Sequence, residues 1–254
     1  MIRDVKSFLD QKYKQYGGHL FIANDPVQIP HRYTKKQDIE IAGFLTAILA
    51  WGQRKTIINN ANRLLQWMDH APHDFMLTHQ PNELEPFNQF VHRTFNGDDC
   101  HFFIKRLSEI YRHHNSLEDF FLTTGNGNTS VKVAPSPLKR NFFMPPHLPR
   151  TEKHLADPMK NATAKRLNMF LRWMVRRDVY SIDFGIWLRL SPALLMCPLD
   201  VHSGNVARKL NLLKRKQNDW KAVEELTGNL RRFEESDPVR YDIPLFALGA
   251  VENF

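Results

Sequence analysis

Apolar residues recur along most of the chain at the three-to-four-residue spacing of amphipathic helices. This spacing is clearest in five segments: residues 38–52, 54–68, 98–114, 161–177 and 219–233. The first segment is apolar on nearly every side, which predicts a helix that is buried all round. Each of the other four has one apolar face and one polar face, which predicts a helix packed on a core by one side only. Because no alternation of apolar and polar residues continues beyond a few positions, the pattern predicts an all-α fold.

Residues typical of helix ends support these boundaries. Gly52 suits the end of the first helix. Side chains able to cap a helix N-terminus precede several apolar stretches: Asp38, Ser116, Ser191, Asp200 and Asp237. A proline follows Ser191 and Asp237 directly, at the first helical position, where proline is favoured.

The periodicity stops between residues 123 and 150. This stretch is rich in Gly, Asn, Ser and Pro, a composition typical of an irregular connection. We therefore expect a single domain over residues 1–254, with lobes 1–122 and 151–254 joined by the irregular segment. A chain of 254 residues is long enough to bury a sizeable core without disulfide bonds.

Composition adds expectations about compartment and partners. The two cysteines, Cys100 and Cys197, are too few for a disulfide framework, a four-cysteine zinc site or a four-cysteine iron–sulfur cluster, and they fit a reducing cytoplasm. The charged N-terminus lacks the apolar run of a signal peptide, and no stretch approaches the roughly 20 apolar residues of a membrane span. The net charge of +8 favours a polyanionic partner, usually nucleic acid, although an ordinary basic enzyme has the same balance.

Asp200 is the residue that most strongly suggests chemistry. It precedes an amphipathic helix, whose free N–H groups and dipole keep a carboxylate ionised, although an isolated aspartate there is ordinarily only a cap. Here L-D-V-H at 199–202 is followed by A-R-K-L at 207–210. These motifs resemble the helix-hairpin-helix DNA glycosylase superfamily, which includes endonuclease III and the archaeal 8-oxoguanine glycosylases. The resemblance implies a two-lobed helical fold in which Asp200 is the catalytic aspartate.

The resemblance extends along the chain. Residues 40–65 are similar to the glycosylase segment in which a buried helix ends and a polar turn meets DNA. This similarity places Gln53, or alternatively Trp51, where those enzymes fill the gap left by a flipped base, and it makes Arg54 and Lys55 DNA-binding residues. It is equally consistent with a core position for Trp51 and a solvated turn position for Gln53.

The whole chain most closely resembles a conserved, uncharacterised bacterial family assigned to that superfamily. The segments that carry this resemblance are DPVQIPHRY, AILAWGQRK, HRTFN, KRLNMFLRWMVR, DFGIW, PLDVH, RKQNDWKAVEELT and DPVRYD, spread from about residue 25 to 249. His31 and His92 lie in two of them, which suggests a structural or a substrate role.

Two features depart from the glycosylase pattern. The standard hairpin, L-P-G-x-G-R-K, has glycines that let backbone N–H groups approach a phosphate, but residues 157–169 contain no glycine. Phosphate binding would then depend on a helix N-terminus at residues 161–163. The cysteine cluster of endonuclease III is also absent.

The resemblance makes Lys165, 35 residues before Asp200, the candidate catalytic lysine, which must lose its proton to attack the sugar. Alternatively, Lys165 contacts phosphate together with other cations. The helical pattern sets Lys165, Met169, Arg172 and Arg176 opposite the apolar face of their helix. The further residues expected to bind DNA are Arg166, Arg172, Arg176 and His202. Neither Asp200 with His202 nor the pair His113–His114 forms a complete metal-ligand set, so no metal or other cofactor is expected.

The resemblance therefore implies an enzyme that flips a damaged base out of double-stranded DNA and cleaves its N-glycosidic bond. Asp200 would stabilise the charge on the sugar, and Lys165 would add lyase activity if it attacked in place of water. Two alternatives stay open. One is a non-catalytic nucleic-acid-binding protein that kept the glycosylase fold, and the other is a His/Asp metal hydrolase.

Overall fold

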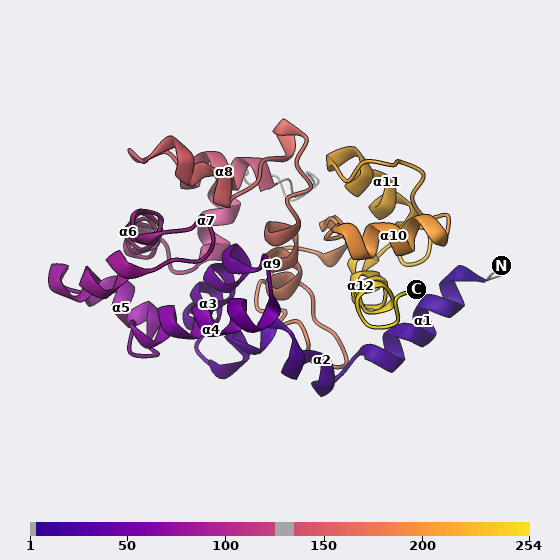
Figure 1. The fold of residues 1–254 in the computed structure, drawn as a ribbon, viewed down its shortest axis with the longest axis horizontal. Coiled ribbons are helices and arrows are strands. Elements are labelled where there is room, and N and C mark those ends of the chain that lie inside the picture. Colours follow the sequence, from indigo (N-terminus) through magenta and orange to yellow (C-terminus); the bar gives the residue numbers. More distant parts are fainter. Residues whose placement is uncertain (1–3, 125–134) are drawn as a thin grey trace. The chain divides into compact units, whose positions relative to one another are not determined.

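The computed structural model describes residues 4–124 and 135–254. The chain divides into two compact units, of which unit 1 combines Met1–Ala23, Thr129–Ser136 and Ala156–Phe254, and unit 2 combines Asn24–Asn128 and Pro137–Leu155. The described residues form the helices drawn in Figure 1 and contain no β-strand, only two isolated bridges. The all-α fold expected from the sequence is confirmed.

Unit 2 contains helices from the N-terminal half of the chain and a short later segment. They are η1 (Pro26–Gln28), η2 (Pro30–Arg32), α3 (Lys36–Leu49), α4 (Arg54–Gln66), α5 (Pro72–Thr78), η3 (Pro81–Gln89), α6 (Gly97–His113), α7 (Leu117–Thr124), most of α8 (Pro135–Phe142) and η4 (Pro149–His154).

Helix α3 is the buried helix that the sequence predicted, since every residue from Ile39 to Leu49 is buried. Its buried Glu40 accepts a hydrogen bond from the Tyr111 hydroxyl at 2.9 Å, which satisfies a carboxylate in an apolar interior. The helix begins at Lys36, one turn earlier than expected. Asp38 therefore lies in the first turn, where it accepts a hydrogen bond from the His73 backbone N–H at 2.8 Å.

Helix α8 corrects the expectation that residues 123–150 are irregular throughout. Residues 125–134 of that segment lie outside the described part of the chain. In α8, the ring of buried Phe142 lies 5.1 Å from that of Phe103 in α6. Proline fits the first turn of a helix, so the prolines that suggested a loop mark the start of α8.

Unit 1 contains the C-terminal helices and the first helices of the chain. They are α1 (Val5–Tyr16), most of α2 (His19–Asn24), η5 (Pro158–Lys160), α9 (Lys165–Val175), η6 (Pro192–Leu194), α10 (Val201–Lys209), α11 (Trp220–Arg231), η7 (Pro238–Tyr241) and α12 (Asp242–Ala250). The sequence grouped α1 with the first lobe instead. In the structure, Tyr13 of α1 joins a buried cluster with Ile182 and Ile243, a pairing that periodicity within one helix does not reveal.

Helix α12 packs closely on the start of α10 at Gly249. A Cβ atom at this glycine would lie 2.8 Å from the carbonyl oxygen of His202. Because that distance is shorter than van der Waals contact, only glycine allows this approach without a shift of one helix. Gly249 therefore fixes α12 against the residues that follow Asp200.

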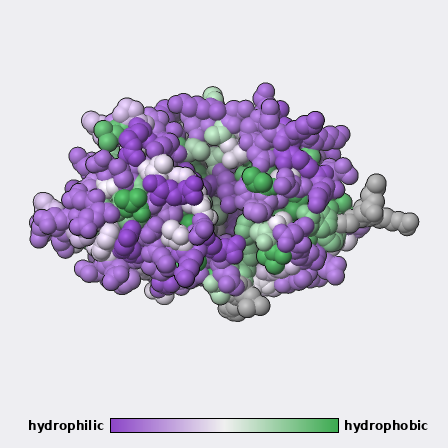
Figure 2. Space-filling view, in the orientation of Figure 1, coloured by the Kyte–Doolittle hydropathy of each residue, from purple (hydrophilic) through white to green (hydrophobic). Residues whose placement is uncertain are grey.

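The face drawn in Figure 2 is largely hydrophilic, with small groups of hydrophobic side chains between polar ones. Across the described residues, the search for a helix long and apolar enough to cross a bilayer finds none.

Candidate functional site

Lys165 and Asp200 form an ion pair in unit 1, with 2.9 Å between Lys165 Nζ and Asp200 Oδ2. Their side chains are 29% and 21% exposed, so solvent or a ligand reaches both. The two residues meet because Lys165 is the first residue of α9 and Asp200 is the N-cap of α10. Backbone N–H groups and the helix dipole make both helix starts positive, an environment that favours anionic groups.

Asp200 is also a complete helix cap. Its Oδ1 accepts a hydrogen bond from the Ser203 backbone N–H at 3.0 Å, and the Ser203 hydroxyl accepts one from the Asp200 backbone N–H at 3.0 Å. This reciprocal arrangement is a capping box. It fixes the carboxylate, so that one oxygen caps the helix and the other faces Lys165.

Burial alone would raise the pKa of Asp200, but the Lys165 ammonium and the Ser203 N–H hold it below its usual value. Asp200 is therefore ionised at neutral pH. Asp242, on α12, behaves in the opposite way, because its burial raises its pKa to about 6 despite the nearby charges of Arg172 and Lys165. The two carboxyl groups thus differ in protonation near pH 6, where Asp242 is partly protonated and Asp200 is ionised.

One face of α12 borders the ion pair, and none of its residues was selected as a site residue from the sequence. Asp242, Phe246 and Gly249 share this face because they stand four and three residues apart. Lys165 Nζ lies 5.7 Å from the Phe246 ring centroid, and the exposed ring of His202 stands edge-on to Phe246 at 6.3 Å. The D-P-V-R-Y-D motif marked the start of this helix, and its periodicity could have identified the face.

The turn before α9 has a left-handed backbone at two positions. Asn161 and Ala164 have positive φ values of 59° and 48°, a conformation that glycine adopts most easily and asparagine tolerates. The turn thus adopts a left-handed backbone without glycine. The helix start expected at residues 161–163 lies instead at Lys165, where α9 begins.

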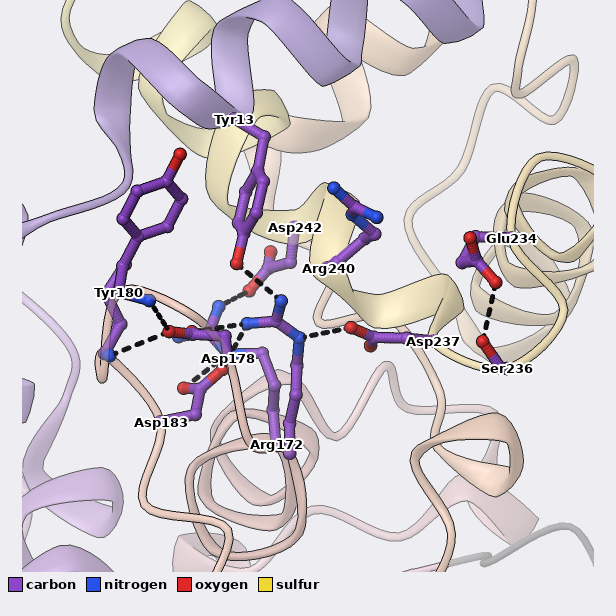
Figure 3. A network of polar contacts seen from close by, with 12 residues as sticks. Tyr13, Arg172, Asp178, Tyr180, Asp183, Glu234, Ser236, Asp237, Arg240 and Asp242 are labelled. Atoms are coloured by element: carbon purple, nitrogen blue, oxygen red, sulfur yellow. Dashed lines mark hydrogen bonds and ion pairs between the residues drawn. The ribbon is translucent and has the colours of Figure 1, made fainter.

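Arg172 and Arg176 are not surface cations, which corrects their assignment to DNA binding. Both are buried and pair with carboxylates, and Figure 3 shows Arg172 beside Asp183 and Asp242. Arg172 pairs with Asp183 at 3.2 Å and with Asp242. Arg176 pairs with several groups: Asp178 at 2.7 Å, Asp183 at 2.9 Å, Asp237 at 2.7 Å and the Tyr13 hydroxyl at 2.7 Å. The polar face that the helical pattern gave to α9 is an internal ion network, and its Met169 is buried as well.

Arg166 and His202 lie in unit 1 with the ion pair. Arg166 follows Lys165 and is partly buried, and this burial lowers its pKa to about 10. His202 is exposed two residues after Asp200. The structure therefore brings together three of the residues selected from the sequence, Lys165, Asp200 and His202, and Arg166 is the next residue after Lys165 in α9.

Gln53, Arg54 and Lys55 belong to unit 2 and are exposed around the start of α4. Gln53 is the N-cap residue, but its side chain makes no capping hydrogen bond. Trp51 is half-buried, and the Arg93 guanidinium lies 4.7 Å from the centroid of its ring.

His92 has contacts that support a structural role. Its Nε2 lies 3.1 Å from the Trp51 carbonyl oxygen, and its Nδ1 lies 2.8 Å from the Asn60 amide nitrogen. A neutral ring that donates from Nε2 and accepts at Nδ1 satisfies both contacts. His31 is half-buried in η2. Across the described residues, no group of three or more His, Cys, Asp or Glu side chains is arranged to hold a metal ion.

Comparison with known protein families matches residues 25–251 to the family described as "Protein of unknown function (DUF2400)", and the chain belongs to this family. No curated protein matches the chain, and no solved structure does.

Proposed function

We propose that this protein is a DNA glycosylase that releases a damaged base, with abasic-site lyase activity through Lys165. The observation that carries the proposal is the 2.9 Å ion pair between Lys165 Nζ and Asp200 Oδ2. The resemblance to glycosylases suggested a catalytic role for Lys165 and for Asp200 independently of each other. If both residues act in one active site, their side chains must be neighbours. Most exposed Lys–Asp pairs have no such role, but this one joins the starts of two helices beside an aromatic ring.

The geometry fits N-glycosidic cleavage. The C1′–N bond breaks with its electron pair leaving on the base, which takes up a proton, and positive charge develops on the sugar. A fixed, ionised carboxylate stabilises that charge, and Asp200 is held for this purpose by Ser203. After Lys165 has given up a proton, which the departing base takes up, its Nζ forms a bond to C1′ in place of the broken C1′–N bond. The C1′–O4′ bond then opens, O4′ takes up the second Nζ proton and a Schiff base forms. Loss of a C2′ proton to water with cleavage of the C3′–O bond expels the 3′ phosphate and cuts the strand.

A non-catalytic nucleic-acid-binding protein is the second candidate function. The observation that favours it is the complete capping box of Asp200, which gives this residue a structural role independent of catalysis. In that case, Lys165 is a phosphate contact and Asp200 fixes its position.

The test uses duplexes that carry single oxidised, alkylated or deaminated bases. The expected result is base release from at least one duplex, with borohydride trapping of a covalent complex that Lys165→Gln abolishes. Lys12→Gln is a matched control, because Lys12 pairs with Glu252 at 2.6 Å and lies 5.9 Å from the centroid of the Phe8 ring. Lack of both base release and trapping across the panel would overturn the glycosylase proposal in favour of binding alone.

A further inference from the structure

The chain between α10 and α11 carries a concentration of positive charge. Residues 208–221, R-K-L-N-L-L-K-R-K-Q-N-D-W-K, hold six Lys or Arg residues and one carboxylate. Their net charge of +5 is more than half of the +8 of the whole chain. We call residues 210–221 the basic arm, and its position can be followed between α10 and α11 in Figure 1.

Hydrogen bonds connect one side of the basic arm to Asp200. Arg208 donates from Nε to the Arg215 carbonyl oxygen at 2.8 Å and from a terminal nitrogen to Asn218 Oδ1 at 2.6 Å. Asn218 Nδ2 then donates to the Asp200 carbonyl oxygen at 3.1 Å. A Cβ at Gly204 would lie 2.9 Å from Asn218 Oδ1, so a larger residue there would displace the Asn218 side chain that links the arm to α10.

Hydrogen bonds also connect the other side of the arm to the turn before Lys165. Asn161 Nδ2 donates to Asp219 Oδ2 at 3.1 Å, and the Asn161 carbonyl oxygen accepts from the Trp220 N–H at 3.2 Å. Asp219 also caps α11 and pairs with Arg215, whose Nε lies 2.6 Å from Asp219 Oδ1. The arm is thus held to the starts of both helices that carry the Lys165–Asp200 pair.

The cations of the arm divide into two groups. Arg208, which precedes it, and Arg215 make internal contacts that fix its shape. Lys214, Lys216 and Lys221 are exposed, and within the described part of the chain none of these three forms an ion pair. Exposed lysines on a fixed backbone are typical of contacts that attract phosphate groups without reading base sequence.

We propose that the basic arm binds the phosphate backbone of double-stranded DNA beside the Lys165–Asp200 site, in place of the buried Arg172 and Arg176. The inference rests on the proposed function for the identity of this partner. Its physical basis is independent of catalysis: the arm combines three exposed lysines with hydrogen bonds that hold it to both helix starts.

The experiment is a salt titration of binding to an undamaged duplex, with the triple variant K214Q/K216Q/K221Q compared with wild type. Each phosphate contact contributes about 0.9 to the slope of log K against log salt, so the slope should fall by about 2 to 3. A control variant removes three exposed cations elsewhere, Lys14, Lys105 and Arg112, and should leave the slope unchanged. Circular dichroism and melting check that both variants are folded.

Equal slopes for the triple variant and wild type would overturn the proposal that the basic arm binds DNA. The base-release assay would still test the glycosylase proposal separately. A reduced slope combined with no base release by wild type would support the arm and leave binding as the function. Vesicles with anionic headgroups provide the comparison with a membrane surface. If the three substitutions weakened vesicle binding but not duplex binding, the DNA assignment would be wrong.

Discussion

Asp200→Asn separates the catalytic charge of this residue from its role as a helix cap. Asparagine caps helices about as well as aspartate, so the hydrogen bond from the Ser203 N–H should survive. The variant loses only the charge that faces Lys165 at 2.9 Å. Any loss of base release can therefore be attributed to that charge if the fold is retained.

Asp200→Asn should have a small effect on folding stability and a large effect on the rate of base release. Both partners of the ion pair are partly exposed, so its loss should cost only about 0.5–1 kcal/mol of folding free energy. Removal of one fixed group that stabilises charge in a transition state typically lowers the rate on the order of 10²–10³-fold. Duplex binding should stay the same or become tighter, because a negative charge near phosphate is removed.

The assay is single-turnover base release under saturating enzyme, with urea denaturation in parallel. Asp4→Asn is the matched control, since Asp4 caps α1 through the Ser7 N–H at 3.0 Å in the same Asp-x-x-Ser arrangement. It should lower neither base release nor duplex binding. If Asp200→Asn released base at the wild-type rate, the carboxylate would have no catalytic role, and Asp200 would be only a cap.

Two further predictions concern α12. Gly249→Ala should destabilise the protein by about 1–3 kcal/mol in urea denaturation, because the added Cβ meets the start of α10. Gly228→Ala in α11 is the control: its added Cβ meets nothing within 4 Å, so the substitution should stabilise the protein by up to about 1 kcal/mol. Equal effects of the two substitutions would contradict the close packing of α10 and α12. For Asp242, the pKa of about 6 exceeds the ordinary 3.8, so the native state binds a proton that the unfolded chain lacks between these pH values. As pH falls from 7 to 4, the free energy of unfolding of wild type should therefore rise by up to about 3 kcal/mol relative to that of Asp242→Asn. If the difference in unfolding free energy between the two proteins did not change with pH, this prediction would be refuted.

Helices with one apolar face were predictable from the sequence, because their core contacts repeat every three to four residues. Helices α4, α6, α9 and α11 all lie where this periodicity placed them. The cap at Asp200 was predictable for a similar reason, since its partner Ser203 is only three residues away. Information of this kind is local, and the sequence displays it directly.

The network around Arg172 and Arg176 was not predictable in this way. On the helical pattern of α9, both arginines stand opposite the apolar residues, as solvent-exposed cations would. Their carboxylate partners lie up to 70 residues further along the chain, in segments that show no matching periodicity. A helix pattern gives the polarity of a face, but it does not distinguish water from buried counter-charges.

The same network links α12 to α9 beside the Lys165–Asp200 site. Burying a guanidinium is costly unless carboxylates and hydrogen bonds compensate for its lost hydration. Arg172 meets this requirement through Asp183 and Asp242, and Asp242 begins the helix that carries Phe246. A displacement of α12 relative to α9 would separate these buried charges, so it is strongly opposed. The ion network that removes Arg172 from the proposed DNA surface therefore fixes the two helices whose side chains border Asp200.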